Sequence, residues 1–276
     1  DIKYPWERAR FQHLLPLGKT FKKTHRADIF DFFKQEIESW ITHNPYLYGP
    51  CWMNAMEVGI RATNLVWLIS FFYTEQTAKT HEGFWNSYLT TLLEHARFIA
   101  NYWEDYDAPN NHYLLNLTGS WYLARFFALH SLFPFGNLAT LWQTVCAGFN
   151  HQLNADGSHY ESSTAYHGLV LQSLQHLAQL NLMSPHALTP ELTEKLVKGS
   201  QFLADSFPHN TNTQVKIGDD DSGCLVWPVT ATLIPDEYRA KKQTDLPVVR
   251  YYPDFGIVFA CNNSWHVSLR TKSFQP

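Results

Sequence analysis

Hydrophobic residues recur at intervals of three and four along this 276-residue chain, up to about residue 209. That spacing is typical of amphipathic helices that bury one face. Short polar loops separate the periodic segments, and most segments are longer than the average helix of about 11–12 residues. The pattern predicts about eight helices, over residues 5–21, 27–43, 51–73, 84–103, 112–133, 138–153, 163–182 and 191–207.

Consecutive helices joined by short connections pack as antiparallel helical hairpins. The sequence has no strict repeat of the kind that marks tetratricopeptide or HEAT arrays. We therefore predict a mainly α fold, an incomplete (α/α) toroid of helical hairpins, over residues 1–209.

The pattern changes after residue 209. Residues 255–261 and 265–271 are rich in β-branched and aromatic residues and flank Asn-Asn-Ser, which predicts a β-hairpin. An isolated hairpin is only marginally stable. We therefore expect residues 210–276 to be a linker and the first strands of an antiparallel β-sandwich domain, truncated here.

Composition narrows the class of protein. A net charge of -4 gives no support for nucleic-acid binding, which needs basic patches. No apolar run approaches the roughly 20 residues of a membrane span. The four cysteines are widely spaced, which argues against a zinc site. Aromatic residues make up 16% of the chain, which suits either a core of large side chains or a cleft with stacking platforms for sugars.

Two polar clusters lie where predicted helices begin: APNNHYLL at residues 108–115 and DGSHYESSTAYH at residues 156–167. Asn110 or Asn111 can cap the first of these helices, and Ser162 or Ser163 the second. Capping alone explains both clusters. Alternatively, two helix N-termini that point into one cavity would form an anion site.

Two further motifs each admit a structural and a functional interpretation. Asn54, Glu57 and Arg61 share one helix face, either as an ordinary Glu57–Arg61 ion pair or as groups on the wall of a cleft. The loop GDDDSG at residues 218–223 lacks the spaced ligands of a calcium loop. We predict a solvated turn there and no metal site in this segment.

The motifs KYPWERARFQHL, WMNAMEVGIRATN, NNHYLLN, DGSHYESSTAYHGLVL and GDDDSG occur in that order. Together they resemble the heparinase II/III-like family of polysaccharide lyases, which includes alginate lyases, over about residues 1 to 270. The resemblance implies an active site in the cleft between toroid and β-sandwich. It implies catalytic roles for Asn111, His112 and Tyr166. The predicted substrate-binding residues are Trp52, Asn54, Glu57, Arg61, His159, Glu161 and His167. One departure is SST, where the family often has Ser-Pro before the tyrosine-containing helix.

The resemblance implies cleavage of an acidic, uronic-acid-containing polysaccharide by β-elimination. Tyr166 would be the general base and acid, while Asn111 and His112 would neutralise the uronate carboxylate. No cofactor is expected in this segment, although a structural metal is expected in the missing part of the β domain. We expect a periplasmic or secreted protein that is trimmed at its start, because it lacks an initiator Met, and a segment that is inactive by itself.

Two alternatives remain open at this point. An inverting glycoside hydrolase on a helical toroid would need two carboxylates about 6.5–9.5 Å apart, drawn from Glu57, Asp156 and Glu161. A non-catalytic glycan-binding protein would keep the fold without using Tyr166.

Overall fold

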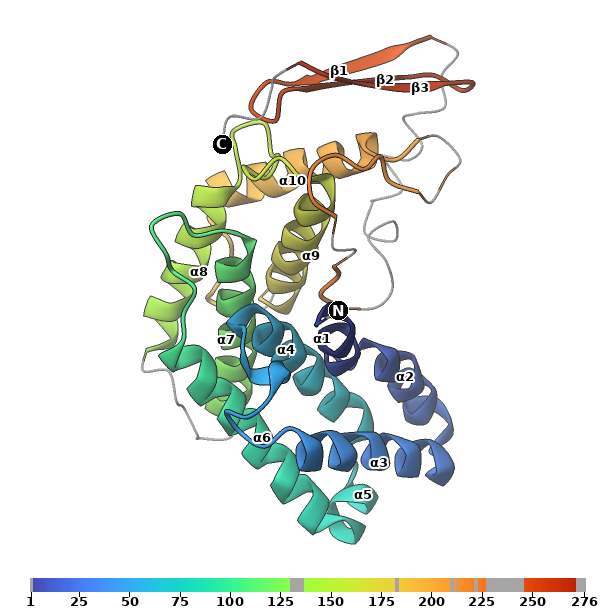
Figure 1. The fold of residues 1–276 in the computed structure, drawn as a ribbon, viewed down its shortest axis with the longest axis vertical. Helices are drawn as coiled ribbons and strands as arrows, with labels where there is room; N and C mark the ends of the chain where they lie inside the picture. Colours follow the sequence, from blue (N-terminus) through green and yellow to red (C-terminus); the bar gives the residue numbers. More distant parts are fainter. Residues whose placement is uncertain are drawn as a thin grey trace. The chain divides into compact units, whose positions relative to one another are not determined.

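The computed structural model describes residues 2–129, 137–181, 184–208, 211, 213–220, 223–226 and 246–271. It is mainly helical and ends in three strands (Figure 1), so the predicted order of helices followed by antiparallel strands is confirmed. The elements are α1 (Lys3–Ala9), η1 (Gln12–Leu14), α2 (Leu15–Thr24), α3 (Ala27–His43), η2 (Pro50–Trp52), α4 (Ala55–Phe72), α5 (Glu75–Thr80), α6 (Glu82–Asn101), α7 (Asn111–Leu129), α8 (Leu138–Gln152), α9 (Thr164–Leu180), α10 (Pro190–Asp205), β1 (Val248–Tyr252), β2 (Ile257–Cys261) and β3 (His266–Arg270).

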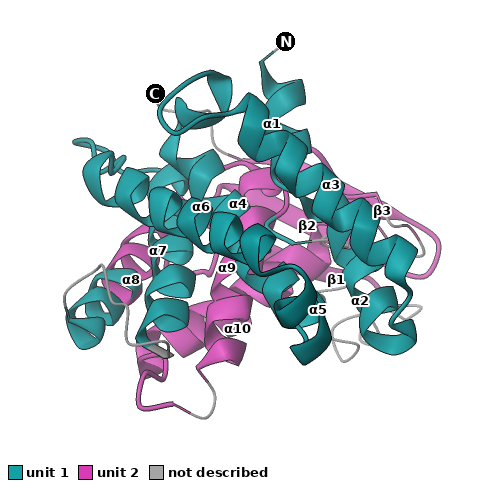
Figure 2. Ribbon diagram, turned by 90° about the horizontal axis from the view of Figure 1, so that it is seen from below, with its two compact units in different colours: residues 1–145, 225–227 teal, residues 146–224, 228–276 magenta. Residues whose placement is uncertain are grey.

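The chain divides into two compact units (Figure 2). Unit 1 comprises Asp1–Val145 and Leu225–Trp227, and unit 2 comprises Cys146–Cys224 and Pro228–Pro276. This division falls inside α8. The predicted boundary at residue 209 follows a different criterion, the change from helix to extended chain.

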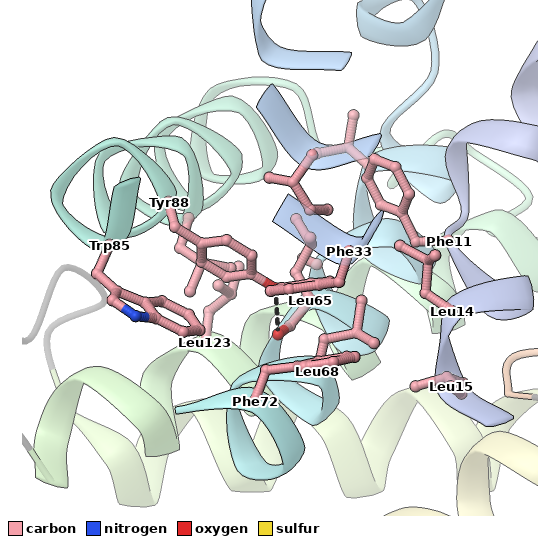
Figure 3. Close-up of a cluster of buried hydrophobic side chains, with 14 of the residues drawn as sticks. Phe11, Leu14, Leu15, Phe33, Leu65, Leu68, Phe72, Trp85, Tyr88 and Leu123 are labelled. Atoms are coloured by element: carbon pink, nitrogen blue, oxygen red, sulfur yellow. Dashed lines mark hydrogen bonds between the residues drawn. The ribbon is translucent and has the colours of Figure 1, made fainter. Parts of the chain in front are cut away.

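Helix α4 is central to unit 1, and apolar side chains from the surrounding helices pack against it (Figure 3). The Phe33 and Phe72 rings are stacked with centroids 3.9 Å apart. The buried Tyr88 hydroxyl donates to the Leu65 carbonyl at 2.8 Å. Many of the aromatic residues therefore belong to this core. A core of large side chains was one of the two interpretations of the aromatic composition.

Helices α4 and α7 approach unusually closely. A Cβ added to Gly119 would lie 2.6 Å from Gly59 Cα, and one added to Gly59 would lie 2.5 Å from the Leu115 carbonyl oxygen. Only glycine fits at both positions. This close contact fixes the starts of α4 and α7 relative to each other.

A short segment from late in the chain belongs to unit 1. The Leu225 carbonyl accepts hydrogen bonds from Gln12 Nε2 at 3.2 Å and from Asn64 Nδ2 at 2.9 Å. Leu225 and Asn64 are both completely buried. Unit 1 therefore completes a buried hydrogen bond with a residue 161 positions beyond Asn64.

The predicted helix over residues 5–21 is wrong as a single element. It is split into α1, η1 and α2 because Phe11 adopts a left-handed conformation with φ 58°, which an unbroken helix does not allow. The turn places Arg10 and Phe11 in the interior, at 6% and 3% exposure. Burial of these two side chains accompanies the break.

In unit 2 the strands form an antiparallel sheet in the order β1-β2-β3, with Tyr252 opposite Ile257 and Cys261 opposite His266. One face packs on Phe202 of α10. The opposite face leaves several apolar side chains at least half exposed. These are Val249, Tyr251, Val267 and Leu269.

Candidate active site

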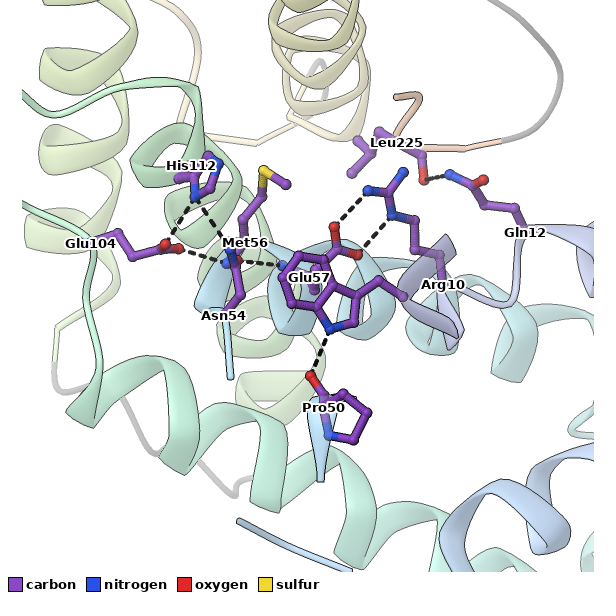
Figure 4. Close-up of polar contacts among 10 residues, drawn as sticks. Arg10, Gln12, Pro50, Asn54, Met56, Glu57, Glu104, His112 and Leu225 are labelled. Carbon is purple, nitrogen blue, oxygen red and sulfur yellow. Dashed lines mark hydrogen bonds and ion pairs between the residues drawn. The ribbon is translucent and has the colours of Figure 1, made fainter. Parts of the chain in front are cut away.

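The carboxylate of Glu104 is the centre of a polar cluster in unit 1 (Figure 4). Its Oε1 lies 2.9 Å from His112 Nδ1. Its Oε2 accepts from the Met56 backbone N–H at 2.7 Å and from Asn116 Nδ2 at 3.0 Å. Because Met56 is in the first turn of α4 and His112 in the first turn of α7, one carboxylate links the starts of two helices.

The start of α7 carries the Asn-His motif. Asn110 caps it, since its Oδ1 accepts from the His112 backbone N–H at 3.0 Å. This settles the choice between Asn110 and Asn111 as the cap. Asn111 is the first helical residue and is 4% exposed, and the side chain of His112 is 33% exposed. His112 is therefore the more accessible half of the motif.

The start of α4 contributes Asn54 and Glu57. Asn54 Oδ1 accepts from the Glu57 backbone N–H at 3.2 Å and caps the helix, while Asn54 Nδ2 lies 3.5 Å from His112 Nδ1. The structure thus brings Asn54 and His112 together beside Glu104. Two helix N-termini converge there, which is favourable for negative charge.

The environment of Glu104 favours its ionised form. Burial opposes ionisation, but hydrogen bonds from His112 and Asn116, the charge of His112 and the Met56 N–H outweigh burial, so the pKa of Glu104 lies below its usual range. A carboxylate that accepts several hydrogen bonds commonly behaves in this way. Glu104 is therefore a fixed negative charge against which His112 is held.

Glu57 and Arg61 share a helix but form their closest polar contacts with other residues. The Glu57 carboxylate forms a two-point ion pair with Arg10, with distances of 2.8 and 2.6 Å. Both side chains are almost completely buried, at 2% and 8% exposure. Glu57 thus binds a protein cation, and its predicted contact with substrate stays a prediction.

Arg61 is completely buried. Its Nε donates to His95 Nε2 at 2.8 Å, and its Nη2 donates to the Cys51 carbonyl at 2.7 Å. Its guanidinium lies over the rings of Trp40 and Trp52. Burial lowers the pKa of Arg61 to about 10. The side chain has no exposed surface and holds a place in the core; the predicted substrate-binding role of Arg61 stays a prediction.

Trp52 is 5% exposed and donates from Nε1 to the Asn44 carbonyl at 3.0 Å. It also lines a pocket that Glu104 borders. Its predicted contact with substrate stays a prediction.

In unit 2 the start of α9 carries Tyr166, which is partly exposed. Ser163 caps this helix by accepting from the Tyr166 backbone N–H at 3.1 Å. Thr164 exchanges hydrogen bonds with the backbone of Ile217, and Ser163 donates to the Asp219 carbonyl. The start of the GDDDSG loop therefore braces the helix that presents Tyr166.

His159 and His167 are completely buried in unit 2. His159 Nε2 lies 3.0 Å from Gln152 Oε1, and His167 Nε2 lies 3.0 Å from the Gly199 carbonyl. Burial lowers the pKa of His159 to about 3 and that of His167 to about 4. Burial therefore favours the neutral form of both rings and a packing role, and their predicted contact with substrate stays a prediction. Glu161 is partly exposed, 3.9 Å from His159 Nε2, and its substrate role stays a prediction.

The prediction that Asn111 and His112 act in one site with Tyr166 involves residues of both units, and it stays a prediction.

Sequence reasoning missed Glu104, Asn116 and Arg10 as partners of the site. No local signal marks Glu104, which stands in an acidic loop and is identified by contacts with residues 48, 12 and 8 positions away.

Within the described ranges, no cluster of three or more His, Cys, Asp or Glu side chains is arranged to hold a metal ion. Part of the GDDDSG loop, Asp221 and Ser222, lies outside those ranges. Among described helices, α4 has the length and composition of a membrane span, but 67% of it is buried inside the structure. That is weak evidence for a span, because the core helix of a folded domain meets the same criteria.

Comparison with known proteins places the chain in a family. Residues 1–213 match the family described as the heparinase II/III N-terminus. No curated protein matches the sequence. A crystal structure of heparinase III is similar with a TM-score of 0.57 and 22% identity, over 73% of this chain and 31% of that one. A heparan sulfate lyase from Pedobacter heparinus is similar with a TM-score of 0.55 and 16% identity, over 76% of this chain and 33% of that one.

The chain therefore spans about a third of the length of these structures. At this level of identity the likeness shows the fold, and it confirms the predicted class of helical hairpins of the (α/α) toroid type followed by the start of an antiparallel β domain. With the family match over residues 1–213, the chain belongs to the heparinase II/III family.

Proposed function

We propose that this chain is the N-terminal part of a polysaccharide lyase that cleaves a uronic-acid-containing glycosaminoglycan by β-elimination. The observation that carries the proposal is the Glu104–His112 pair, held at 2.9 Å where the N-termini of α4 and α7 meet. Family membership and the similarity to heparinase III and a heparan sulfate lyase support the same reaction class.

β-Elimination begins with removal of the proton on C5 of the uronate, next to its carboxylate. The negative carboxylate must be neutralised so that the enolate-like transition state is stabilised. In the proposed arrangement His112 donates Nδ1–H to the ionised Glu104, which favours the imidazolium form. His112 Nε2–H and the Asn111 amide then serve as donors to the uronate carboxylate, supported by the start of α7.

We assign the proton transfer to Tyr166. Its phenolate oxygen would take the C5 proton and then return a proton to the departing O4, which leaves a C4=C5 double bond in the product. Support for this role comes from the position of Tyr166 in the first turn of α9, where the braced cap fixes the backbone and the helix dipole favours a phenolate.

The alternative of an inverting hydrolase receives less support. Such an enzyme needs a carboxylic acid whose pKa is raised, so that it can protonate the leaving group. The pKa of Glu104 is lowered instead. Of the three carboxylates named for the hydrolase, Glu57 is bound by Arg10 and Asp156 accepts hydrogen bonds from the backbone of Ser158 and Asp254. Glu161 is then left without a second carboxylate from that set.

The test uses the complete parent protein with a panel of uronic-acid polysaccharides, heparan sulfate first. Ultraviolet absorbance reports the new C4=C5 bond, and a reducing-end assay reports any bond cleavage. We expect absorbance to rise with wild type and with Tyr160→Phe, a matched control in the same segment. It should be lost with Tyr166→Phe and Asn111→Ala.

Three outcomes would contradict the proposal in different ways. New reducing ends without absorbance would indicate hydrolysis. Glycan binding without any cleavage would indicate a binding protein. Full activity of Tyr166→Phe would retain the lyase but remove Tyr166 as its base.

A further inference from the structure

A pocket of about 530 Å³ opens in unit 1 beside Glu104. Its lining comes from the loop after α3, the start of α4, the end of α6 and the loop that follows α6. Trp52 and Phe98 contribute buried side chains to this lining, at 5% and 4% exposure. Pockets for small ligands usually have volumes of about 300–1,000 Å³, so this one has room for a sugar ring and part of its neighbour.

The pocket also includes large side chains that are exposed to solvent. Met53, Tyr102 and Tyr106 are 68%, 51% and 67% exposed, and all three line it. Exposed apolar side chains gathered around one hollow mark a binding surface more often than isolated ones do. Aromatic rings present flat faces with polar edges, which suit a pyranose ring that is apolar on its faces and polar at its rim.

The charged side chains that line the pocket determine whether a charged or an uncharged sugar ring fits there. No Lys, Arg or His lines the pocket among the described residues, and Glu104 is its one charged lining residue. Glu104 is ionised and points Oε1 at His112. A second carboxylate in the pocket would meet this charge with no lining cation to offset it, because His112 lies outside the lining and binds the uronate in the proposed mechanism. An uncharged ring would not meet this repulsion.

We propose that this pocket is a saccharide subsite, which holds the uncharged sugar next to the uronate that His112 binds. The inference rests on the proposed function, because the position of the uronate comes from it. Glu104 belongs to both places, since it lines the pocket and binds His112. The Glu104 carboxylate thus lies between the site of the reacting uronate and the site of its neighbour. Binding of the neighbour in the pocket determines which uronate of the polymer lies beside His112.

The test is Tyr106→Ala in the full-length protein. Tyr106 is well exposed, so its removal should leave folding intact. Tyr106→Phe restores the ring, and Tyr4→Ala removes a tyrosine that is also well exposed (82%) and does not line the pocket. Two quantities are measured with size-defined oligosaccharides of the polymer that the enzyme cleaves, or of heparan sulfate if it cleaves none. They are the kinetic constants and, by isothermal titration, the dissociation constant.

We expect Tyr106→Ala to raise KM and the dissociation constant about ten-fold on long oligosaccharides, the change that loss of one stacked ring produces, with kcat little changed. Tyr106→Phe and Tyr4→Ala should match wild type. Equal constants for wild type and Tyr106→Ala on every length, or no binding by wild type, would overturn the subsite.

The two proposals can fail separately. If wild type cleaves nothing but binds oligosaccharides in a way that depends on Tyr106, the lyase proposal fails and the pocket still binds saccharide. If cleavage occurs and Tyr106→Ala changes nothing, the subsite fails and the lyase proposal remains.

Discussion

A single buried carboxylate, Glu104, ties together three segments of unit 1. It accepts from Met56 N–H and Asn116 Nδ2, and it holds His112 by its Nδ1 nitrogen. Its position therefore fixes the orientation of the histidine, and the histidine ring lies beside its negative charge. Glu104 is a positioning residue in the proposed mechanism, because it acts through His112.

Glu104→Gln should test this role. The amide keeps the shape and can still accept from Met56 N–H, but it removes the charge that favours the imidazolium. We expect kcat to fall about ten- to a hundred-fold, the size of effect seen for groups that orient a catalytic ligand, and the falling limb of the pH–rate profile to move to lower pH. The measurement is a pH–rate profile of the full-length enzyme. A profile of unchanged shape with only a lower melting temperature would reduce Glu104 to a structural role.

The Arg10–Glu57 pair makes a separate prediction at this scale. Both partners are buried, so Glu57→Ala removes the carboxylate that binds the buried Arg10 guanidinium, which costs about 3–5 kcal/mol. Arg8→Ala removes an ion pair of which one side chain is 65% exposed and should cost at most about 1 kcal/mol. Urea unfolding of both variants gives the comparison. Similar losses for the two would show that Glu57 is not the buried anchor that its contacts indicate.

At the scale of elements, the contact between α4 and α7 determines where the Asn-His motif lies. A Cβ at Gly119 would meet the backbone of Gly59 at 2.6 Å, and backbone atoms cannot yield as a flexible side chain can. Gly119→Ala should therefore destabilise unit 1 by about 1–3 kcal/mol through overpacking. It should also lower activity, since the starts of both helices must shift.

Gly83→Ala is the matched control for that substitution. Gly83 is exposed in α6 and has no atom near its missing Cβ, so alanine should stabilise by up to about 1 kcal/mol. Melting temperatures that move in opposite directions would support the argument. A neutral Gly119→Ala would mean that the two helices can separate without cost.

The comparison of predicted and observed elements shows which features are local. Helix α3, Ala27–His43, has the predicted ends, because its apolar stripe and its boundaries lie in its own sequence. The segment over residues 5–21 is broken at Phe11, where Arg10 turns inward to a partner 47 positions away. The short α5 was missed because its capping box pairs Thr74 with Thr77 instead of the usual Glu or Gln.

The site shows the same division. The Asn-His motif lies at the start of α7, and Ser163 lies directly before α9. Each is next to its own helix in the sequence, so each could be recognised as a helix start. The partners that decide the roles of the remaining polar residues come from distant segments. Without them, Arg61 on a helix face looks like a cleft residue, although Cys51 and His95 hold it in the core.

At the scale of the whole molecule, buried histidines make stability depend on pH. Burial lowers the pKa of His159 to about 3 and that of His167 to about 4, whereas an unfolded histidine titrates near 6.5. Below pH 6.5 the unfolded chain takes up protons that the folded chain does not, so stability falls as pH falls. Each histidine contributes a loss on the order of 1 kcal/mol per pH unit between about pH 6.5 and 4.

The midpoint of urea unfolding, measured from pH 7.5 to 4.5, should therefore decrease steadily on acidification. His167→Gln should reduce this slope, while His43→Gln, at an exposed position, should leave it as in wild type. A midpoint that is constant down to pH 4.5 would mean that the folded protein protonates both histidines as readily as the unfolded chain does, which would contradict their lowered pKa values.

The return of Leu225 to unit 1 has a consequence for the order in which the protein is made. Asn64 donates to the Leu225 carbonyl in the interior, so this buried contact waits for a residue that the ribosome adds 161 positions later. At about 5–20 residues per second, the delay is roughly 8–30 s. Nascent chains halted before Leu225 should be cut within unit 1 by added protease faster than chains halted well beyond it. Most of unit 1 is thus synthesised before unit 2, yet unit 1 closes only after the whole of α9 and α10 has followed.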